Sequence, residues 1–303
     1  MSSTHIPFSK LRVLILFFIY ILGASPKSAA QTLEKHLQLT EVKELMKAAK
    51  NVELAAPVIS PDGKYFIYTE AGFLKLFLKK IDSDDKAILI DSMGAGWRPV
   101  WSLDAKKIFY REKKGSRLNN DVKLKAYEVK TGLKTDFNNV NPDAIFSYPL
   151  AKKDRHPLVF INYKTTQLEA ESKDKSKHWI ISTETGLYFP LLSPDRKYVA
   201  VHHGPNIWVY KTDGSGLDCK FGAGLATAWS PDSKRLIGFI ETGQSAPGSE
   251  LYIYNIESAT SYRLTDTKNI HEMYPSWSSD GKKILFSDDH TGSIYTANII
   301  QIK

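Results

Sequence analysis

The sequence predicts an all-β protein, a six-bladed β-propeller whose blades are four-stranded antiparallel sheets, and three observations lead to this prediction. A pattern with the core Ser-Pro-Asp-Gly-Lys recurs along the chain. The recurrences stand 37 to 50 residues apart. Each is followed by further short apolar strands, separated by turn residues such as Thr131-Gly132 and Asp213-Gly214. A period of about 40–50 residues that contains several short strands is typical of one propeller blade.

Five copies of the pattern share one register, and a sixth copy is degenerate. The five clear copies place their acidic residue at Asp62, Asp104, Asp195, Asp232 and Asp280. Asp154 marks the degenerate copy, which divides the long interval between Asp104 and Asp195 into 50 and 41 residues. Six units of about 45 residues therefore fill the chain after its N-terminal segment.

Each copy predicts a strand, a tight turn and a second strand. Pro after the Ser presets φ for the first central residue of the turn, and the Asp side chain hydrogen-bonds the backbone just ahead of it. Gly63 and Gly281 suit the left-handed conformation that a three-residue hairpin loop requires. Arg196, Ser233 and Ala105 stand at the same place in the other copies, so we expect Gly to be preferred there without being obligatory.

The last unit ends after its third strand, and we expect the start of the chain to supply the fourth. Residues 36–41 match the outer-strand pattern of residues 263–266. A propeller must close its ring, because an unpaired sheet edge favours aggregation. Residues 42–50 are mostly good helix formers, and we expect them to form a short N-terminal helix before the first blade.

The third unit departs from the pattern. No clear outer strand is evident between Ile181 and the next copy. Residues 169–177 carry charges of both signs without an apolar stripe, which predicts a long solvated loop. Residues 113–121 in the second unit predict a similar loop.

Residues 1–30 have the composition of a cleavable secretory signal peptide. Lys10 and Arg12 precede an apolar run at 13–22, and Ser28-Ala29-Ala30 supplies small residues for cleavage after Ala30. The apolar run is too short to span about 30 Å of hydrocarbon, so we expect no membrane span in the mature chain. We therefore expect a periplasmic or secreted protein whose residues 31–303 form one domain.

The composition of the remaining chain limits the classes of partner that we expect. Removing residues 1–30 takes away three basic residues and lowers the net charge from +8 to +5. No Arg-rich run or nucleic-acid motif is present, so we expect no nucleic-acid partner. Cys219 is the single cysteine, which excludes an internal disulfide, and we expect it to pack in an outer strand. We expect a monomer without a cofactor.

The copies, read as (Trp/Ile/Leu)-Ser-Pro-Asp-Gly-Lys-x-Ile-x-Phe, resemble the repeat of TolB-type six-bladed propellers, also called WD40-like propeller repeats. The resemblance covers about residues 37–303 and implies a propeller without the N-terminal α/β domain of TolB. Similar repeats occur in the propellers of prolyl oligopeptidase-like enzymes, but the Gly-x-Ser-x-Gly nucleophile elbow of those hydrolases is absent from this sequence. Because the repeated residues build blades, the resemblance predicts the fold better than the function.

Candidate binding residues lie in the loops that do not repeat. In a propeller, the loops between the second and third strands and those between blades open on one face, which we call the loop face. The Ser-Pro-Asp-Gly turns lie on the opposite, turn face. The polar or aromatic residues that this rule assigns to the loop face are Trp97, Arg98, His202, His203, His271, Glu272, Asp289 and His290.

Two functions are compatible with these residues. The first is a binding scaffold that recognises an envelope protein, a peptide or a glycan around the channel mouth, without catalytic or metal-binding residues. The second is a metal-assisted lyase of the oligogalacturonate type, with His and Asp ligands and a Lys or Arg base. No pair of these residues has a metal-motif spacing, and blades four and six are not neighbours, so the sequence favours binding over catalysis. Trp101, Trp229 and Trp277 stand just before the turns, and we expect them in the core.

Overall fold

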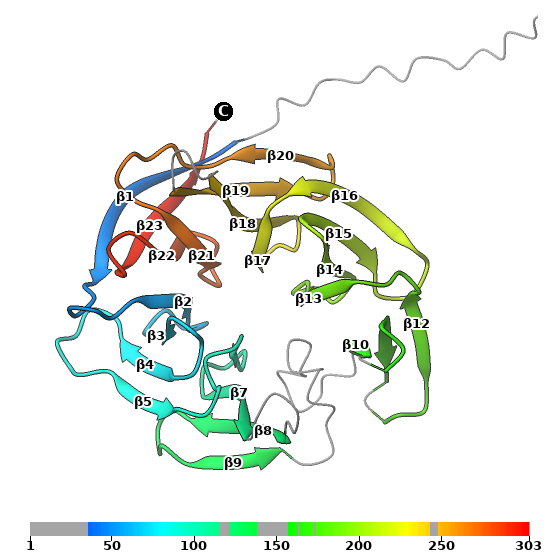
Figure 1. The fold of residues 1–303 in the computed structure, drawn as a ribbon, viewed down its shortest axis with the longest axis horizontal. Helices are drawn as coiled ribbons and strands as arrows, with labels where there is room; N and C mark the ends of the chain where they lie inside the picture. The colour runs from blue at the N-terminus through cyan, green and yellow to red at the C-terminus, as the bar shows by residue number, and fades with distance from the viewer. Residues whose placement is uncertain are drawn as a thin grey trace, which may run out of the picture. The chain divides into compact units, whose positions relative to one another are not determined.

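Six antiparallel sheets surround a central axis in the unit His36–Ile302 (Figure 1). The computed structural model describes residues 36–114, 121–137, 157–162, 164–172, 174–242 and 248–302. Every regular element within those ranges is a β-strand. No helix capable of crossing a membrane occurs among them. The predicted six-bladed, all-β propeller is therefore confirmed.

The first three blades follow one another along the chain. Blade one consists of β2 (Leu54–Ile59), β3 (Tyr65–Glu70), β4 (Leu76–Lys80) and β5 (Ile88–Asp91). Blade two consists of β6 (Val100–Trp101), β7 (Lys107–Lys114), β8 (Asp121–Glu128) and β9 (Lys134–Phe137). The described strands of blade three are β10 (Leu158–Asn162), β11 (Gln167–Glu171) and β12 (His178–Ser182).

The last three blades complete the ring. Blade four consists of β13 (Leu187–Leu192), β14 (Tyr198–His203), β15 (Asn206–Lys211) and β16 (Leu217–Ala223). Blade five consists of β17 (Leu225–Trp229), β18 (Arg235–Thr242), β19 (Gly248–Asn255) and β20 (Thr260–Arg263). Blade six consists of β21 (Glu272–Trp277), β22 (Lys283–Asp288), β23 (Ile294–Gln301) and, from the start of the chain, β1 (Leu37–Met46).

The N-terminal strand closes the ring as predicted. β1 pairs antiparallel with β23, from Leu37 opposite Gln301 to Met46 opposite Ile294, and forms the outer edge of blade six (Figure 1). The backbone N–H and C=O groups on that side of β23 are thereby paired.

The predicted helix at residues 42–50 is wrong. Residues 42–46 continue β1, with register shifts on either side of the Lys43–Thr296 pair. Leu45 and Met46 pack against a buried cluster that includes Leu54 and Ile294. Good helix propensity is a weak preference, and pairing with β23 together with this burial outweighs it.

Blade three also differs from the prediction. Part of the predicted loop at 169–177 belongs to β11, where Leu168, Glu169 and Ala170 are buried. β10 follows the degenerate copy in the sequence, so it corresponds to β3, the second strand of blade one. β12 is then the fourth, outer strand of blade three, which was not evident in the sequence. The degenerate copy itself lies outside the described residues, as do residues 1–35.

The loop predicted at 113–121 is also shorter than expected. Lys113 and Lys114 extend β7 and pair with Val122 and Asp121 of β8. Residues 115–120, between the two strands, lie outside the described part of the chain.

The repeated turn is a hydrogen-bonded unit with nearly constant geometry. In all five clear copies the Ser hydroxyl donates to the Asp carboxylate over 2.6–2.7 Å. The same carboxylate accepts the N–H of the residue two positions on, at 3.0–3.2 Å. The residue after the Asp has φ between 56° and 71° whether it is Gly, Ala, Arg or Ser. The recurring residues therefore specify architecture, as their recurrence suggested.

The tryptophans before these turns join neighbouring blades. Trp101 is buried and donates from Nε1 to the backbone oxygen of Val58 at 3.1 Å. Trp229 is equally buried and donates to the oxygen of Leu191 at 2.8 Å. Trp277, which stands at the same position of blade six, is only partly buried. The core role predicted for these residues holds fully for the first two.

Candidate functional site

The central channel contains a cavity of about 410 Å³. Its walls come from the innermost strands of blades one, two, four, five and six, with Phe73 added from the loop after β3. Most of the lining residues are apolar. Several are prolines: Pro57, Pro61, Pro99, Pro194 and Pro275. Proline carries no backbone N–H, so these positions add apolar surface without exposing a donor to the channel.

Blades one, two, four and six share a strained position at this cavity. Ala56, Arg98, Phe189 and Tyr274 each stand four residues before the turn Ser, and their φ angles lie between 47° and 52°. Each also precedes a proline. Left-handed backbone costs an L-residue about 1–2 kcal/mol, and such residues persist only where the surrounding structure holds them.

Sheet pairing holds these strained residues in place. The pairing register shifts at this point in β2, β13 and β21, as expected for a β-bulge. A bulge changes the direction in which the side chain points, and three of these positions carry large side chains that line the cavity.

Aromatic side chains gather at the loop-face end of the cavity and form what we call the mouth cluster: Phe73, Trp97, Phe189 and Tyr274. The Trp97 ring lies 5.1 Å from Phe73 and 5.1 Å from Phe189, between ring centroids. Phe73 lies 5.6 Å from Tyr274. The cluster connects blades one, two, four and six, and the contact between Trp97 and Phe189 joins two blades that are not neighbours.

Arg98 and His202 lie beside the mouth cluster. The Arg98 guanidinium is 5.5 Å from the centroid of the Phe189 ring. Burial and the nearby Arg111 lower the pKa of Arg98 to about 9, so it still carries its charge at neutral pH. The rings of Tyr188 and Phe189 lie 5.4 and 6.0 Å from that of His202.

His202 is fully buried and neutral. Its Nε2 accepts the backbone N–H of Ala226 at 3.0 Å, which joins blade four to blade five. Because Nε2 accepts, the ring proton resides on Nδ1. Burial and the charge of Arg98 lower the pKa of His202 to about 4.

A second group of predicted residues lies where β21 begins and β22 ends in blade six. Burial raises the pKa of Tyr274, and Asp289 of this group is near enough to add to that rise. The rings of His271 and His290 are 5.2 Å apart, and the N–H of Asp289 donates to the oxygen of His271 at 3.0 Å. The partner of Glu272 across the strand pair is Asp288, and both are buried. The structure therefore brings His271, Glu272, Asp289 and His290 close to one another, while His202 lies elsewhere, between blades four and five.

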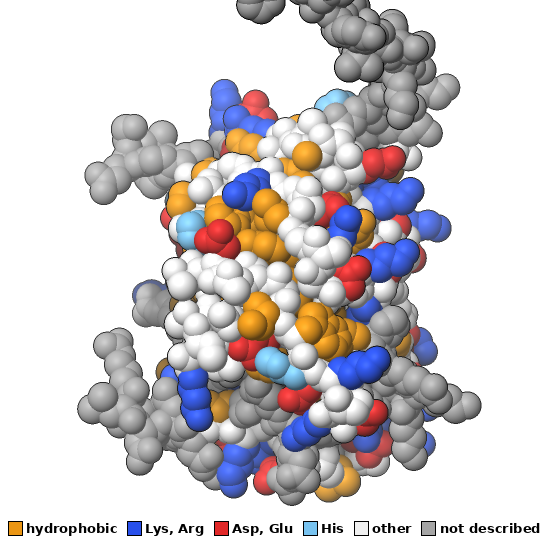
Figure 2. All heavy atoms as spheres, turned by 90° about the vertical axis from the view of Figure 1, so that its right-hand side faces the viewer, with side chains coloured by type: hydrophobic (Ala, Val, Ile, Leu, Met, Phe, Trp, Pro, Cys, Tyr) orange, Lys and Arg blue, Asp and Glu red, His pale blue; other side chains and the backbone are white. Residues whose placement is uncertain are grey.

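His203 points to neither group. Its ring lies 4.3 Å from that of Trp208, and the Lys220 ammonium lies 3.8 Å from the centroid of the Trp208 ring. Trp208 and Lys220 line a separate open groove of about 460 Å³ between the outer strands of blades three and four. Figure 2 shows this flank, where exposed hydrophobic side chains are interspersed with basic and acidic ones.

The residues selected from the sequence include Trp97, Arg98 and His202, which lie in or beside the mouth cluster, but not Phe73, Phe189 and Tyr274. A signal was available for the last two. Both are aromatic residues that precede a proline four residues before the turn Ser, at the position that Arg98 occupies in blade two. Phe73 lies in an ordinary loop, and nothing in its sequence context marks it.

No protein-family model and no curated protein matches this sequence. Among solved structures, an oligogalacturonate lyase in complex with manganese has a TM-score of 0.54 and 13% identity, over 88% of this chain and 96% of that one. An oligogalacturonate lyase from Vibrio parahaemolyticus has a TM-score of 0.51 and 12% identity, over 87% and 96%. A putative TolB from Agrobacterium tumefaciens has a TM-score of 0.50 and 14% identity, over 89% and 99%. At these identities the similarity concerns the fold, which is a TolB-like six-bladed propeller.

The manganese of the first similar structure invites a test of the residues present here. Within the described ranges, no three His, Cys, Asp or Glu side chains lie where they could hold a metal ion together. Nε2 of His202 is already engaged by Ala226. The described residues therefore do not fit a manganese site, and we derive no reaction step from one.

Proposed function

We propose that this TolB-like propeller is an exported binding scaffold of the cell envelope, which captures a protein or peptide partner at the loop-face end of its central channel. The partner places an apolar side chain against the mouth cluster and into the cavity below it. Recognition depends on a rigid ring, and no covalent chemistry is involved.

The observation that carries this proposal is the convergence of strained residues on one opening. Phe73, Arg98, Phe189 and Tyr274 all have left-handed backbone, with φ between 51° and 58°, and all line the same cavity. Strained backbone at bulky residues concentrates at ligand-binding and active sites. Four such residues from four blades at one opening support a binding role for it.

The cavity suits an apolar group of a ligand. The cavity volume of about 410 Å³ falls within the range of about 300–1,000 Å³ that ligand pockets occupy. Two hydroxyl groups of the wall are engaged within the protein, since Thr227 donates to the oxygen of Pro275 and Ser276 donates to that of Pro57, both at 2.6 Å. An aromatic or branched aliphatic side chain is the kind of anchor that such a wall stabilises.

Export is proposed from the sequence of residues 1–30 alone. Mass spectrometry of the protein recovered from the periplasm or medium of an expressing bacterium tests it directly. A mature chain that begins at Gln31 is the expected result, and full-length protein confined to the cytoplasm would contradict export.

The binding proposal is tested by selecting peptides from a random displayed library on the immobilised wild-type protein. Selected peptides are then titrated by calorimetry against the wild type, Trp97→Ala and Phe189→Ala. We expect an aromatic or branched aliphatic residue at a fixed position of the peptides, and at least ten-fold weaker binding to both variants.

The matched control is Leu103→Ala, which truncates a side chain that is 64% exposed on the turn face. It should leave the affinity unchanged. Peptides that bind Trp97→Ala and Phe189→Ala as tightly as the wild type, or that lose affinity only for Leu103→Ala, would refute a site at the mouth cluster. Circular dichroism of each variant establishes that it is folded.

A further inference from the structure

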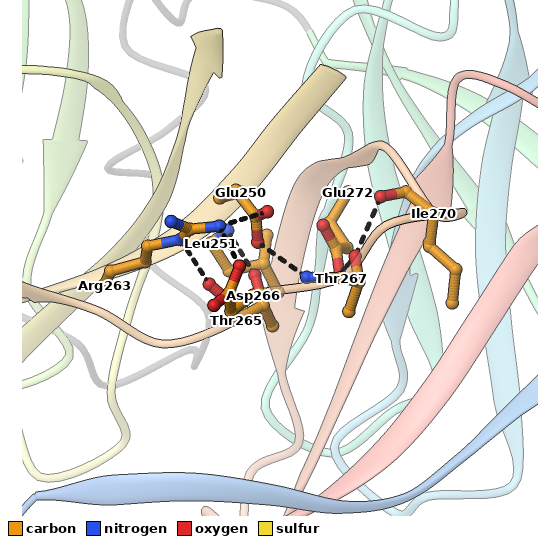
Figure 3. A network of polar contacts seen from close by, with 8 residues as sticks. All are labelled: Glu250, Leu251, Arg263, Thr265, Asp266, Thr267, Ile270 and Glu272. Carbon is orange, nitrogen blue, oxygen red and sulfur yellow. Dashed lines mark hydrogen bonds and ion pairs between the residues drawn. The ribbon is translucent and has the colours of Figure 1, made fainter. Parts of the chain in front are cut away.

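A polar network links blade five to blade six beside the loop face (Figure 3). Arg263 at the end of β20 donates to the Glu250 carboxylate at 2.6 Å and to Asp266 at 2.6 Å. The other oxygen of Glu250 accepts the N–H of Thr267 at 3.4 Å. Thr267 in turn contacts Glu272, the first residue of β21. The network thus ties the connecting segment, residues 264–271, to both blades.

The contacts of Thr267 are sensitive to the protonation state of Glu272. Oγ1 of Thr267 lies 2.9 Å from the backbone oxygen of Ile270 and 2.8 Å from Oε1 of Glu272 (Figure 3). A threonine hydroxyl has only one hydrogen to donate. Two separate hydrogen bonds at this oxygen require that Thr267 donates to Ile270 and that a protonated Glu272 donates to Thr267. With an ionised Glu272, the two acceptors compete for the single Thr267 hydrogen.

The surroundings of Glu272 also disfavour a negative charge. Its side chain is 1% exposed, and its Oε2 is buried without a hydrogen-bond partner among the described residues. Burial raises the pKa of Glu272 to about 7, the charges of Glu250 and Asp288 add to this rise, and hydrogen bonds from Thr267 and the backbone partly oppose it. Asp288 is buried as well but accepts three hydrogen bonds, from the N–H groups of His271 and His290 and from the Thr291 hydroxyl.

The charged groups around this site lie on three strands and the connecting segment. Glu250 on β19, Asp288 on β22 and Asp266 in the connecting segment are acidic, and Arg263 on β20 is the basic group of the network. Arg263 already pairs with both Glu250 and Asp266. A carboxylate at Glu272 would therefore be a further negative charge among buried carboxylates, with its balancing cation already engaged.

We propose that Glu272 is a proton-controlled latch, which holds the segment 264–271 against blades five and six when protonated and releases it when the proton leaves. Loss of the proton to water turns Glu272 into an acceptor. The Thr267 hydroxyl then donates to Glu272, and the Ile270 oxygen loses its donor. The segment that ends at His271 loosens, and β21 carries Tyr274 of the mouth cluster two residues beyond Glu272.

Amide hydrogen exchange of the full-length protein at pH 6 and pH 8 tests the latch, after correction for the intrinsic exchange rate. We expect protection of the amides in residues 265–271 to fall at least ten-fold between the two pH values in the wild type. Glu272→Gln keeps the donor to Thr267 at every pH, so its protection should stay high at pH 8. Thr267→Val removes the hydroxyl and should show low protection at both.

The matched control is Asp266→Asn, which removes the same charge from the same segment at an exposed side chain. It should follow the wild type. Equal pH dependence in the wild type and Glu272→Gln would overturn the latch. If Glu272→Gln does not fold, the carboxyl ¹³C resonance of Glu272 in the wild type decides: a titration midpoint at or above pH 6 supports the latch, and one below pH 6 overturns it. Neither readout uses a ligand, so the result is independent of the proposed binding function.

Discussion

Replacing His202 by Gln should make the protein more resistant to acid. The imidazole is buried between blades four and five, and its Nε2 accepts the N–H of Ala226. The amide oxygen of Gln can accept the same hydrogen bond but takes up no proton. The variant therefore removes a titration while keeping the contact between the blades.

The magnitude follows from the pKa of His202, which is lowered from 6.5 to about 4 in the folded protein. Between these values the unfolded chain binds a proton that the folded chain does not. The free energy of unfolding of the wild type therefore falls as the pH drops from 6.5 to 4. At about 1.4 kcal/mol per pKa unit, this titration accounts for about 3 kcal/mol.

Urea unfolding of both proteins at intervals from pH 7.5 to pH 4 measures the effect. The difference in unfolding free energy, variant minus wild type, should rise by about 3 kcal/mol over that range. The control is His203→Gln, which makes the same substitution at a partly buried neighbour and so separates the effect of full burial from that of the substitution itself. A difference for His202→Gln that stays constant with pH would refute the argument that His202 is buried in its neutral form.

Three further predictions concern stability. The free energy of unfolding of Glu272→Gln, relative to that of the wild type, should rise by about 3 kcal/mol between pH 4.5 and pH 7, because a folded-state pKa raised to about 7 makes the wild type less stable as the pH rises. Urea unfolding measures this difference, and a difference that grows on acidification instead would contradict the prediction. Trp229→Phe should cost about 1–3 kcal/mol more than Trp277→Phe, because only the former leaves a backbone oxygen, that of Leu191, without its indole donor; equal losses in thermal unfolding would argue against that hydrogen bond. Deleting residues 36–46 should expose the edge of β23 and produce soluble aggregates in size-exclusion chromatography, whereas a stable monomer would show that ring closure by β1 is dispensable.

The two buried titrations act in opposite directions. Acidification from pH 6.5 to 4.5 destabilises the protein through His202 and stabilises it through Glu272. Their contributions are of similar size, so the wild type should have a flatter stability profile in this window than either single variant. Neither residue reveals this from the sequence, where both read as exposed loop residues.

The fold was predictable because its information is local and repeated. Ser60, Asp62 and Gly63 form a turn from neighbouring residues, and each later copy repeats the same hydrogen bonds. The N-terminal strand could also be assigned, since ring closure demands a partner for β23. The helix at 42–50 was mispredicted because its residues have helical propensity, while the edge that overrides this propensity lies at the far end of the chain.

The candidate site was only partly predictable because distant bulges build it. A left-handed backbone at Phe189 or Tyr274 depends on strand register, and register cannot be read from residue type. Whether a polar residue near a loop is exposed or buried also depends on its packing. His202 is buried because Tyr188 and Phe189 of the neighbouring strand contact its ring, whereas the adjacent His203 faces the other side of the strand.

The closure of blade six has a consequence for folding during synthesis. β1 is made first and β23 last, and Leu37 finds its partner Gln301 only when nearly the entire chain is available. Contacts between such distant residues form slowly, because a long loop must close before they stabilise anything. Before the two strands pair, β23 presents an open edge and β1 has no partner strand. We therefore expect the pairing of β1 with β23 to be a late step of folding, and a chaperone that shields the N-terminal strand to delay the native ring without blocking the first five blades.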